Sequence, residues 1–234
     1  MRVVVLQPGY LPWLGFFDQM ARCDTFVVYD DVGFDKNGWR NRNRVKTRDG
    51  VRWLTVPVLL AEHSAQPRIR DVRIDPRAPW ARKHLATIEQ SYRQAPFFEP
   101  LFGSLQTVLS QPYEYLVDLD LALIDALARR LGLKTRLVRS SELGVEGERV
   151  ERLVRICRRL GADRYLSGNA AQCYLDEERF REAGISVAWQ NYRHPEYPQL
   201  HGGFEPHLSV IDLMFNCGAD SLRILRMPDA TALD

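Results

Sequence analysis

The chain has 234 residues, 45% of them hydrophobic and 26% charged, which is the composition of a globular protein with a sizeable core. Its 32 basic and 30 acidic residues argue against general nucleic-acid binding, which needs a clear basic excess. We find no signal peptide and no apolar run of about 18 residues, so we expect a cytoplasmic protein without membrane insertion. Four widely spaced cysteines predict reduced thiols and no metal site.

The N-terminal segment predicts a strand, a helix and a second strand. Residues 2–6 are a β-branched run that ends at Gln7, which is typical of a strand buried on both faces. Residues 12–22 follow a helical pattern with a proline in the first turn. Residues 25–29 form another buried run that ends at Asp30 and Asp31. This order predicts a βαβ unit.

The middle of the chain predicts an inserted hairpin and a group of helices. Residues 41–58 read as two antiparallel strands with a turn at 48–50, and residues 61–76 read as irregular. Helical patterns follow at 78–94, 98–110 and 113–131.

Strands and helices alternate again in the C-terminal part. Further strands are expected at 136–139, 164–166 and 186–190. Helices are expected at 148–160, 170–183, 208–216 and 219–226, and a polar loop with three histidines covers 191–207.

These elements predict an α/β fold with an open, mostly parallel, Rossmann-like sheet and helices on both faces. We expect a single α/β domain over 1–234, in which 1–32 and 133–234 form the sheet core. Residues 33–132 would be the hairpin and helical insertion. In open sheets of this kind ligands bind outside the carboxyl ends of the strands, so we expect the site residues there.

Two strand ends carry polar residues. Gln7 and Tyr10 precede a helix N-terminus whose amides could hold an anion, although a plain strand-to-helix turn would read the same way. Asp30 and Asp31 could ligate Mg²⁺, act as a base or bind an amine, and one of them could instead cap a turn.

Residues 34–44 concentrate basic, amide and aromatic side chains. Arginine forks suit phosphate or carboxylate, and a tryptophan offers a stacking surface for a sugar or a base. A solvated basic loop is the alternative. The candidate binding residues here are Lys36, Trp39, Arg40, Asn41 and Arg42.

Ser167 and Asn169 follow the strand at 164–166. Ser167 is a candidate ligand contact, but the G-x-S-x-G motif of a hydrolase elbow is absent. Asn169 is a candidate binding residue or a simple helix N-cap.

The loop at 191–207 lies at the same predicted edge and is too polar for core. His194 is closest to the preceding strand and is the candidate general base, with Asp212 as the group that orients it. A loop anchor is the alternative for any single histidine. Cys217 is a weaker nucleophile candidate. Further binding candidates from this loop are Tyr197, Gln199 and His201.

Several nucleotide-binding motifs are missing. The chain has no P-loop, no G-x-G-x-x-G and no H-x-G-H signature of nucleotidyl transferases. No cofactor can therefore be assigned from the sequence.

Long strings of the sequence resemble the WbqC-like family. They are QPGYLPWLGFF at 7–17, DDV at 30–32, WRNRN at 39–43, HPEYPQ at 194–199 and LSVIDLMFNCG at 208–218. The resemblance covers nearly the whole chain. Members of this family occur among genes for O-antigen and other surface polysaccharides, and a glycine (aminoacyl) transferase role onto an amino sugar has been proposed for the family. The resemblance carries no settled catalytic residues.

The sequence and the resemblance together predict a transferase that forms an amide or ester bond. It would move an acyl or aminoacyl group, such as glycyl, onto an amine or hydroxyl acceptor such as a nucleotide-linked amino sugar. In this hypothesis His194 is the base, Asp30 and Asp31 bind an ammonium group, and arginines hold a phosphate or carboxylate. The expected partners are small-molecule substrates and a carrier protein or another macromolecule that bears the donor.

Two other functions fit the same sequence. The first is an ATP-dependent ligase or nucleotidyl transferase, by analogy with the order of strands and helices. The second is a non-catalytic sugar- or nucleotide-binding protein, for which no donor would give turnover.

Overall fold

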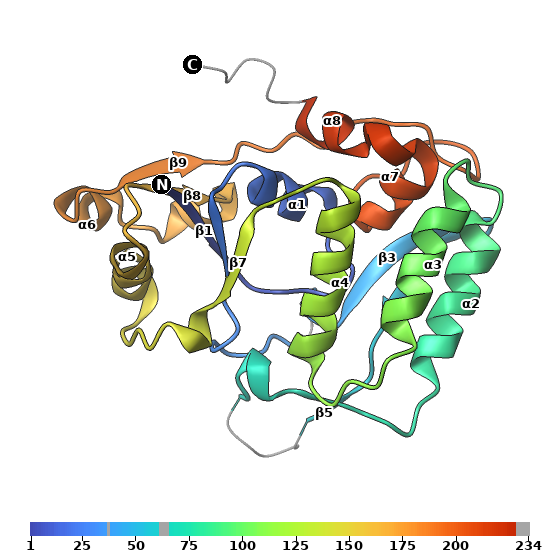
Figure 1. Cartoon of the computed structure of the whole chain (residues 1–234), viewed down its shortest axis with the longest axis horizontal. Coiled ribbons are helices and arrows are strands. Elements are labelled where there is room, and N and C mark those ends of the chain that lie inside the picture. Colours follow the sequence, from blue (N-terminus) through green and yellow to red (C-terminus); the bar gives the residue numbers. More distant parts are fainter. Residues whose placement is uncertain (37, 61–65, 228–234) are drawn as a thin grey trace.

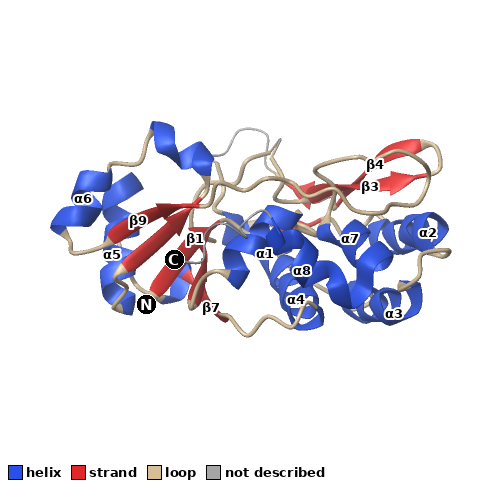
Figure 2. Cartoon of the chain, turned by 90° about the horizontal axis from the view of Figure 1, so that it is seen from above, coloured by secondary structure: helices blue, strands red, loops and turns tan. Residues whose placement is uncertain are grey.

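A computed structural model of the chain describes residues 1–36, 38–60 and 66–227. Its main sheet has five parallel strands in the order β7-β2-β1-β8-β9 and lies toward one end of the molecule (Figures 1 and 2). The strands are β1 (Arg2–Leu6), β2 (Thr25–Val28), β7 (Arg136–Arg139), β8 (Arg164–Ser167) and β9 (Ser186–Trp189). The predicted α/β fold with a Rossmann-like sheet is confirmed.

Alternate side chains of the strands bury themselves on opposite faces, which is why the strands read as continuous apolar runs. Val3 and Val5 pack into a cluster with α5 (Arg149–Leu160) and α6 (Glu177–Glu182). Val4 packs on the other face, in the larger core shared with α1 (Leu14–Ala21) and α4 (Leu116–Arg130).

The segment between β2 and β7 forms a hairpin and a group of helices beside the sheet. Figure 2 shows the β3–β4 hairpin together with α2, α3 and α7 at the end of the molecule away from α5 and α6. The hairpin strands β3 (Arg42–Thr47) and β4 (Gly50–Thr55) are antiparallel, as expected from the turn at 48–50. The other elements here are β5 (Val58–Leu59), η1 (Ile69–Asp71), β6 (Arg73–Ile74), α2 (Trp80–Tyr92) and α3 (Phe98–Leu109).

The C-terminal part differs from the prediction at one place. The helix expected over 170–183 is two elements, a 3-10 helix η3 (Asn169–Cys173) and α6. They separate because the Asp176 side chain caps a new helix by accepting from the Glu178 N–H at 3.1 Å. The remaining elements are η2 (Ser140–Glu142), α7 (Val210–Cys217), η4 (Gly218–Asp220) and α8 (Ser221–Arg226). Of the segment 61–76, residues 61–65 lie outside the described residues; the rest contains η1 and β6.

Three segments that are distant in sequence meet beside the carboxyl edge of the sheet. The Ser209 N–H donates to the Arg44 carbonyl at 2.9 Å, and the Val210 N–H donates to the Pro12 carbonyl at 2.9 Å. The starts of α1 and α7 are therefore joined to β3. This junction holds the polar loop 191–207 next to the residues that follow β1.

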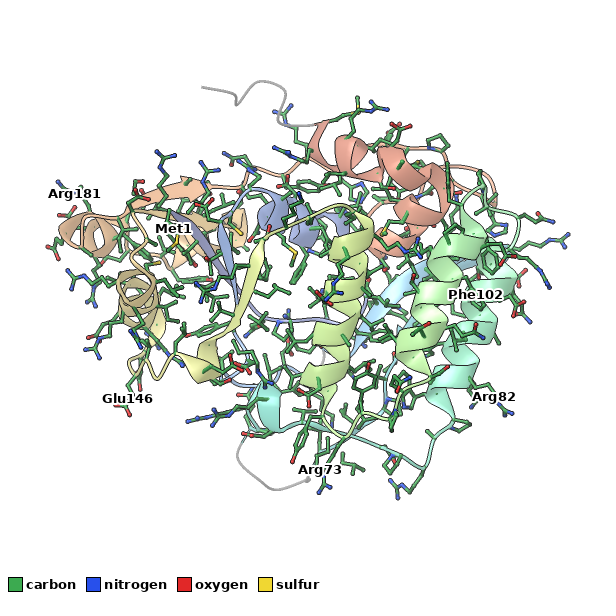
Figure 3. All side chains as sticks on the ribbon, in the orientation of Figure 1. Met1, Arg73, Arg82, Phe102, Glu146 and Arg181 are labelled. Carbon is green, nitrogen blue, oxygen red and sulfur yellow. The ribbon has the colours of Figure 1, made fainter. Side chains whose placement is uncertain are left out.

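Charged side chains lie on the surface of both ends of the molecule. Arg181 and Arg82 point outward at opposite ends in Figure 3, and both are exposed. Within the described residues, no helix combines the length and the apolar character that crossing a bilayer requires.

Candidate functional site

The strand order places a topological switch point between β1 and β8. The chain runs outward from β1 through β2 and β7, then returns to β8 on the other side of β1. In open parallel sheets, the crevice at this point is where ligands bind. Gln7 follows β1, and Ser167 ends β8.

A cavity of about 520 Å³ lies at this switch point. Its wall combines tyrosine rings, strand ends and the start of α5. The lining side chains with polar groups are Gln7, Gln19, Tyr29, Arg149, Tyr165, Ser167 and Tyr174. We call it the tyrosine pocket. Its size is in the range that small-molecule sites have.

A second cavity, of about 330 Å³, adjoins the first. Both cavities are lined by Leu6 and Gln7. The second has largely apolar walls, and we call it the tryptophan pocket. Its other lining residues are Gly9, Pro12, Trp13, Phe16, Trp39, Arg40, Asn43 and His207.

Gln7 is thus the side chain common to the two pockets. It is partly exposed, and its carboxamide makes no hydrogen bond to the rest of the described chain. A free amide offers two N–H donors and one acceptor. The predicted binding role of Gln7 fits this placement.

A buried amide network supports the floor of the tyrosine pocket. Gln19 Nε2 donates to Gln190 Oε1 at 2.6 Å, and Gln190 Nε2 donates to Asp18 Oδ2 at 2.8 Å and to the Gly15 carbonyl at 2.7 Å. The network ties α1 to the end of β9. Sequence reasoning did not single out Gln19, although adjacent polar residues, Asp18 and Gln19, inside a largely apolar helix are a usable signal.

Asp30 does not face either pocket. Its carboxylate is fully buried and accepts from Arg139 Nε at 2.7 Å, the Ser141 N–H at 3.0 Å and the Ser141 hydroxyl at 2.8 Å. The Ser140 hydroxyl lies 3.1 Å from it. These donors occupy the lone pairs that an ammonium group would need, so Asp30 joins the ends of β2 and β7 and its assignment to amine binding is corrected.

Asp31 is engaged in the same way. It accepts from the Ser140 hydroxyl at 2.6 Å and from the Arg152 guanidinium. Burial raises the pKa of Asp31, but the hydrogen bonds from Ser140 and Arg152 outweigh it and the net pKa is lowered. Arg152 also lies over the Tyr29 ring at 5.1 Å. Asp31 therefore fixes the arginine behind a wall of the tyrosine pocket, rather than binding substrate as predicted.

His194 uses both ring nitrogens within its own loop. Nδ1 lies 3.0 Å from the Pro195 carbonyl, and Nε2 accepts from the His207 N–H at 3.2 Å. This pattern requires the neutral tautomer with the proton on Nδ1. Burial lowers the pKa of His194, which favours the same neutral form. The geometry is that of a loop anchor, which was the alternative reading of this histidine.

His207 is the histidine that lines the tryptophan pocket. Its ring lies 6.3 Å from the Trp13 ring and 5.2 Å from the His194 ring, centroid to centroid. Its backbone is left-handed, with φ at 57°. Such a conformation costs free energy in a residue with a side chain. Two hydrogen bonds hold the His207 backbone in this conformation. The His207 N–H donates to His194, and Arg44 donates to the His207 carbonyl at 3.0 Å.

Asp212 does not orient His194, and that prediction is wrong. The carboxyl group is fully buried and accepts from the Tyr92 hydroxyl at 2.7 Å. Burial raises the pKa of Asp212, although the hydroxyl groups of Tyr92 and Tyr197 act in the opposite direction. Asp212 thus joins α7 to α2 in the core. Nothing in the sequence spacing distinguishes this from a loop-facing carboxylate at a helix start.

The other candidates from the polar loop hold the loop in place. The Gln199 amide donates to the Glu205 carbonyl at 2.9 Å and accepts from the Glu205 N–H at 2.8 Å. Lys46 Nζ donates to the Gly202 carbonyl at 2.8 Å. Tyr197 is buried against His194, and His201 Nε2 lies 2.7 Å from the Ser91 carbonyl, in a different cavity. Their predicted binding roles are replaced by structural ones.

Three more candidates have internal partners. Tyr10 is fully buried, with its hydroxyl 2.9 Å from His84 Nδ1. Asn41 donates to the Val56 carbonyl at 2.8 Å. Asn169 exchanges two hydrogen bonds of 2.8 Å with Asn191, near the end of β9. All three stabilise the edge without lining either pocket.

The basic segment divides between the pocket and the surface. Trp39 and Arg40 line the tryptophan pocket, whereas Lys36 is exposed outside it. Arg42 lies over the Trp53 ring at 4.7 Å, and the Trp39 and Trp53 rings are 5.1 Å apart. The prediction is thus supported in position for two of the five residues of this segment, Trp39 and Arg40.

None of the four cysteines is among the residues that line the two pockets. Burial raises the pKa of the Cys217 thiol to about 11 and that of Cys157 to about 12. A thiol with so high a pKa carries little of the reactive thiolate. In the described part of the chain, no group of three metal-binding side chains is found either.

Comparison with known proteins decides the family. The sequence profile of the WbqC-like protein family matches residues 7–224. The chain belongs to the WbqC-like protein family. This WbqC-like protein is also 39% identical over 227 residues to the uncharacterized protein Rv1507c of Mycobacterium tuberculosis (strain ATCC 25618 / H37Rv), covering 96% of this chain and 97% of that one. No solved structure matches the present chain.

A buried carboxyl group lies behind the tryptophan pocket of this WbqC-like protein. Asp120, on α4, is fully buried, and neither of its oxygens has a hydrogen-bond partner among the described residues. Burial raises the pKa of Asp120 well above its usual range, and the nearby Arg40 only partly opposes this. Asp120 therefore favours the neutral acid form in the folded protein.

We expect Asp120→Asn to stabilise the protein at neutral pH. The folded-state pKa of Asp120 is raised, so its contribution to stability is complete below about pH 4 and is lost as the pH rises. Asparagine does not titrate, so the Tm of Asp120→Asn should exceed that of the unmodified protein at pH 7. Thermal unfolding at pH 4 and pH 7 measures it. Asp125→Asn on the same helix, in an exposed ion pair, should change Tm little, and a gain for Asp120→Asn that is equal at both pH values would contradict the expectation.

Gly15 allows the Trp13 ring to lie flat on α1 in this WbqC-like protein. A Cβ at Gly15 would overlap that ring. We expect Gly15→Ala to push the ring into the tryptophan pocket and to destabilise the fold by about 1–3 kcal/mol. Gly103→Ala in α3 is the matched control, because its Cβ would meet open space and should give no loss of stability. Urea titration measures the free energy of unfolding of both variants. Equal stability of the two would contradict the packing argument.

Proposed function

We propose that this WbqC-like protein is a transferase that moves an acyl or aminoacyl group onto an amine or hydroxyl acceptor. The acceptor class we propose is a nucleotide-linked amino sugar used in surface polysaccharide synthesis. The observation that supports a two-substrate reaction is the pair of cavities, about 520 and 330 Å³, that meet at Leu6 and Gln7. A donor and an acceptor placed in adjoining pockets have their reacting groups close together, which is the main requirement for group transfer.

The two pockets suit different ligands. The larger one offers three tyrosines, Ser167 and an arginine, which are hydrogen-bonding and stacking groups of the kind that hold a sugar or a nucleotide. The smaller one has apolar walls with a single arginine and a histidine, which suits a compact acyl or aminoacyl group. We therefore assign the acceptor to the tyrosine pocket and the transferred group to the tryptophan pocket.

His207 is the side chain we propose as general base. It lines the tryptophan pocket, and in the described chain its ring makes no hydrogen bond that would occupy it. In this proposal His194 is a positioning residue, because it holds the His207 backbone through Nε2. The role first predicted for His194 passes to its neighbour, since neither nitrogen of His194 is free to accept a substrate proton.

Ligand-dependent thermal stability tests this proposal. The probes are a uridine-diphosphate amino sugar, acetyl-coenzyme A, glycine and ATP with Mg²⁺. A ligand at 100 times its dissociation constant stabilises by about 2.7 kcal/mol, or about 5–11 °C here. We expect an amino-sugar ligand and a donor ligand to stabilise additively, because they occupy different pockets, and mass spectrometry to detect the acylated sugar.

Other outcomes would replace the proposal. Stabilisation by ATP alone, with release of pyrophosphate or AMP, would establish the ligase or nucleotidyl transferase. Ligands that compete for one pocket, with no turnover from any donor, would establish the sugar- or nucleotide-binding protein.

A further inference from the structure

The tryptophan pocket contains a cation, Arg40, that nearby carboxyl groups compensate only in part. Arg40 lines the pocket and is largely enclosed by protein. Its Nη1 donates to the Pro8 carbonyl at 2.8 Å, and its Nε is buried without a hydrogen-bond partner in the described chain. No ion pair of Arg40 with a described carboxylate is found. A partly buried guanidinium that lacks an ion-pair partner is costly for a protein to keep.

Two carboxyl groups are close enough to interact electrostatically with Arg40, but neither fully compensates its positive charge. They are Asp120, on α4 behind the pocket, and Asp35, on the exposed loop that follows β2. Burial lowers the pKa of Arg40 more than these two carboxyl groups raise it. The loss of hydration of the Arg40 charge therefore outweighs the attraction from the carboxyl groups. Asp120 favours its neutral form for the reason given above. A ligand anion at Arg40 would supply the missing charge.

The rest of the pocket limits which anion fits. Trp13, Phe16 and Trp39 provide apolar walls. The Asn43 amide is already used, because it donates to the Leu11 carbonyl at 2.7 Å and accepts from the Arg44 N–H at 2.8 Å. The side-chain donors left for a ligand include the outer guanidinium nitrogens of Arg40, the Gln7 amide and the ring N–H of His207. A single permanent cation matches a carboxylate, which has one charge and two oxygens, better than a dianionic phosphate.

We infer that the tryptophan pocket binds a monocarboxylate with a short apolar body. The carboxylate pairs with Arg40 and accepts from Gln7, and the apolar body lies against Trp13, Phe16 and Trp39. This inference rests on the proposed function in taking the pocket as one half of the cleft, and it names the chemistry of the ligand there.

Paired ligands test the inference on the unmodified protein. The probes are 3-phenylpropionate, its amide and phenyl phosphate, titrated by calorimetry at neutral pH and low salt. We expect the carboxylate to bind about 10-fold to 100-fold more tightly than the amide, because only the carboxylate makes charge-assisted hydrogen bonds. Phenyl phosphate should bind more weakly than the carboxylate. Equal affinity of acid and amide, tighter binding of the phosphate, or no binding of any carboxylate in a series from butyrate to indole-3-acetate overturns the inference.

Arginine variants identify the partner of the carboxylate. Arg40→Lys keeps the charge but loses the fork, and we expect it to lose about 10-fold in affinity for 3-phenylpropionate, with Arg40→Met losing more. Arg42→Met is the matched control, because Arg42 stacks on Trp53 outside the pocket. Thermal unfolding of each variant without ligand verifies folding, and the acid-amide comparison above stands even if Arg40→Met does not fold. Unchanged affinity in Arg40→Lys and Arg40→Met overturns the assignment.

The outcome is separable from that of the proposed function. Carboxylate binding without any transfer product would contradict only the transferase. Transfer onto an amino sugar by a protein that does not bind carboxylates would contradict only the present inference.

Discussion

Replacing Asp30 with alanine should destabilise the protein by about 3–5 kcal/mol, or at least about 6 °C in Tm. The carboxylate is fully buried at the end of β2 and accepts from Arg139 and from two groups of Ser141. Its removal leaves a partly buried guanidinium and a backbone N–H without their acceptor, and the loss of such partners costs more than the bonds themselves contribute. The free energy of unfolding, from urea titration, measures the effect.

Asp118→Ala is the matched control for Asp30→Ala. Asp118 accepts from the same arginine at 3.3 Å but is about half exposed, so its loss should cost less than about 1 kcal/mol. A similar cost for the two variants would mean that the buried network at the end of β2 contributes little. If the folded Asp30→Ala variant bound ligand much more weakly than its loss of stability explains, Asp30 would again be a candidate binding residue.

The sheet was accessible from the sequence because burial on both faces leaves a distinctive pattern. Each of the five strands is a short apolar or β-branched run that ends at a polar turn, and each was predicted within one or two residues. The predicted strand ends also placed Gln7 and Ser167 at the carboxyl edge of the sheet, because that edge follows from chain direction alone. Trp39 and Arg40 were predicted from composition, because arginine and tryptophan together suit ligand contact, and both line the tryptophan pocket.

The hydrogen-bond partners of Asp30 and Asp31 could not be predicted from the sequence in the same way. Asp30 and Arg139 are separated by 109 residues and meet only because β2 and β7 are neighbours in the sheet. The strand order is a tertiary property that the local pattern does not contain. Two adjacent aspartates at a strand end therefore read as a free binding pair, although the fold supplies two arginines and two serines that satisfy them.

The histidines of the polar loop show a second limit. Distance from the strand end favoured His194, but the loop folds back so that its last residue, His207, reaches the tryptophan pocket. That path depends on the joining of α7 to α1 and β3 through Ser209 and Val210, which are contacts between distant segments. The left-handed backbone of His207 has no signature in the sequence, since histidine is not a residue that turns require.

His207→Asn should lower kcat for acyl transfer by about 10²- to 10⁴-fold, which is the usual contribution of a general base. Asparagine tolerates the left-handed backbone at this position, so the fold and the pocket should be retained. His194→Ala should act differently. It removes the acceptor of the His207 N–H and part of the packing with Tyr197, so it should lower stability and lower kcat less. Product formation by mass spectrometry and thermal unfolding, measured on the same preparations, separate the two effects.

His201→Asn is the matched control for His207→Asn. His201 also has a left-handed backbone, with φ at 65°, and lies in the same loop, but its ring contacts the Ser91 carbonyl in a different cavity. We expect that variant to keep its kcat. Loss of turnover in His194→Ala with full stability, together with normal turnover in His207→Asn, would restore His194 as the base. Because both ring nitrogens of His194 are engaged and the His207 ring lines the pocket, we expect the opposite result.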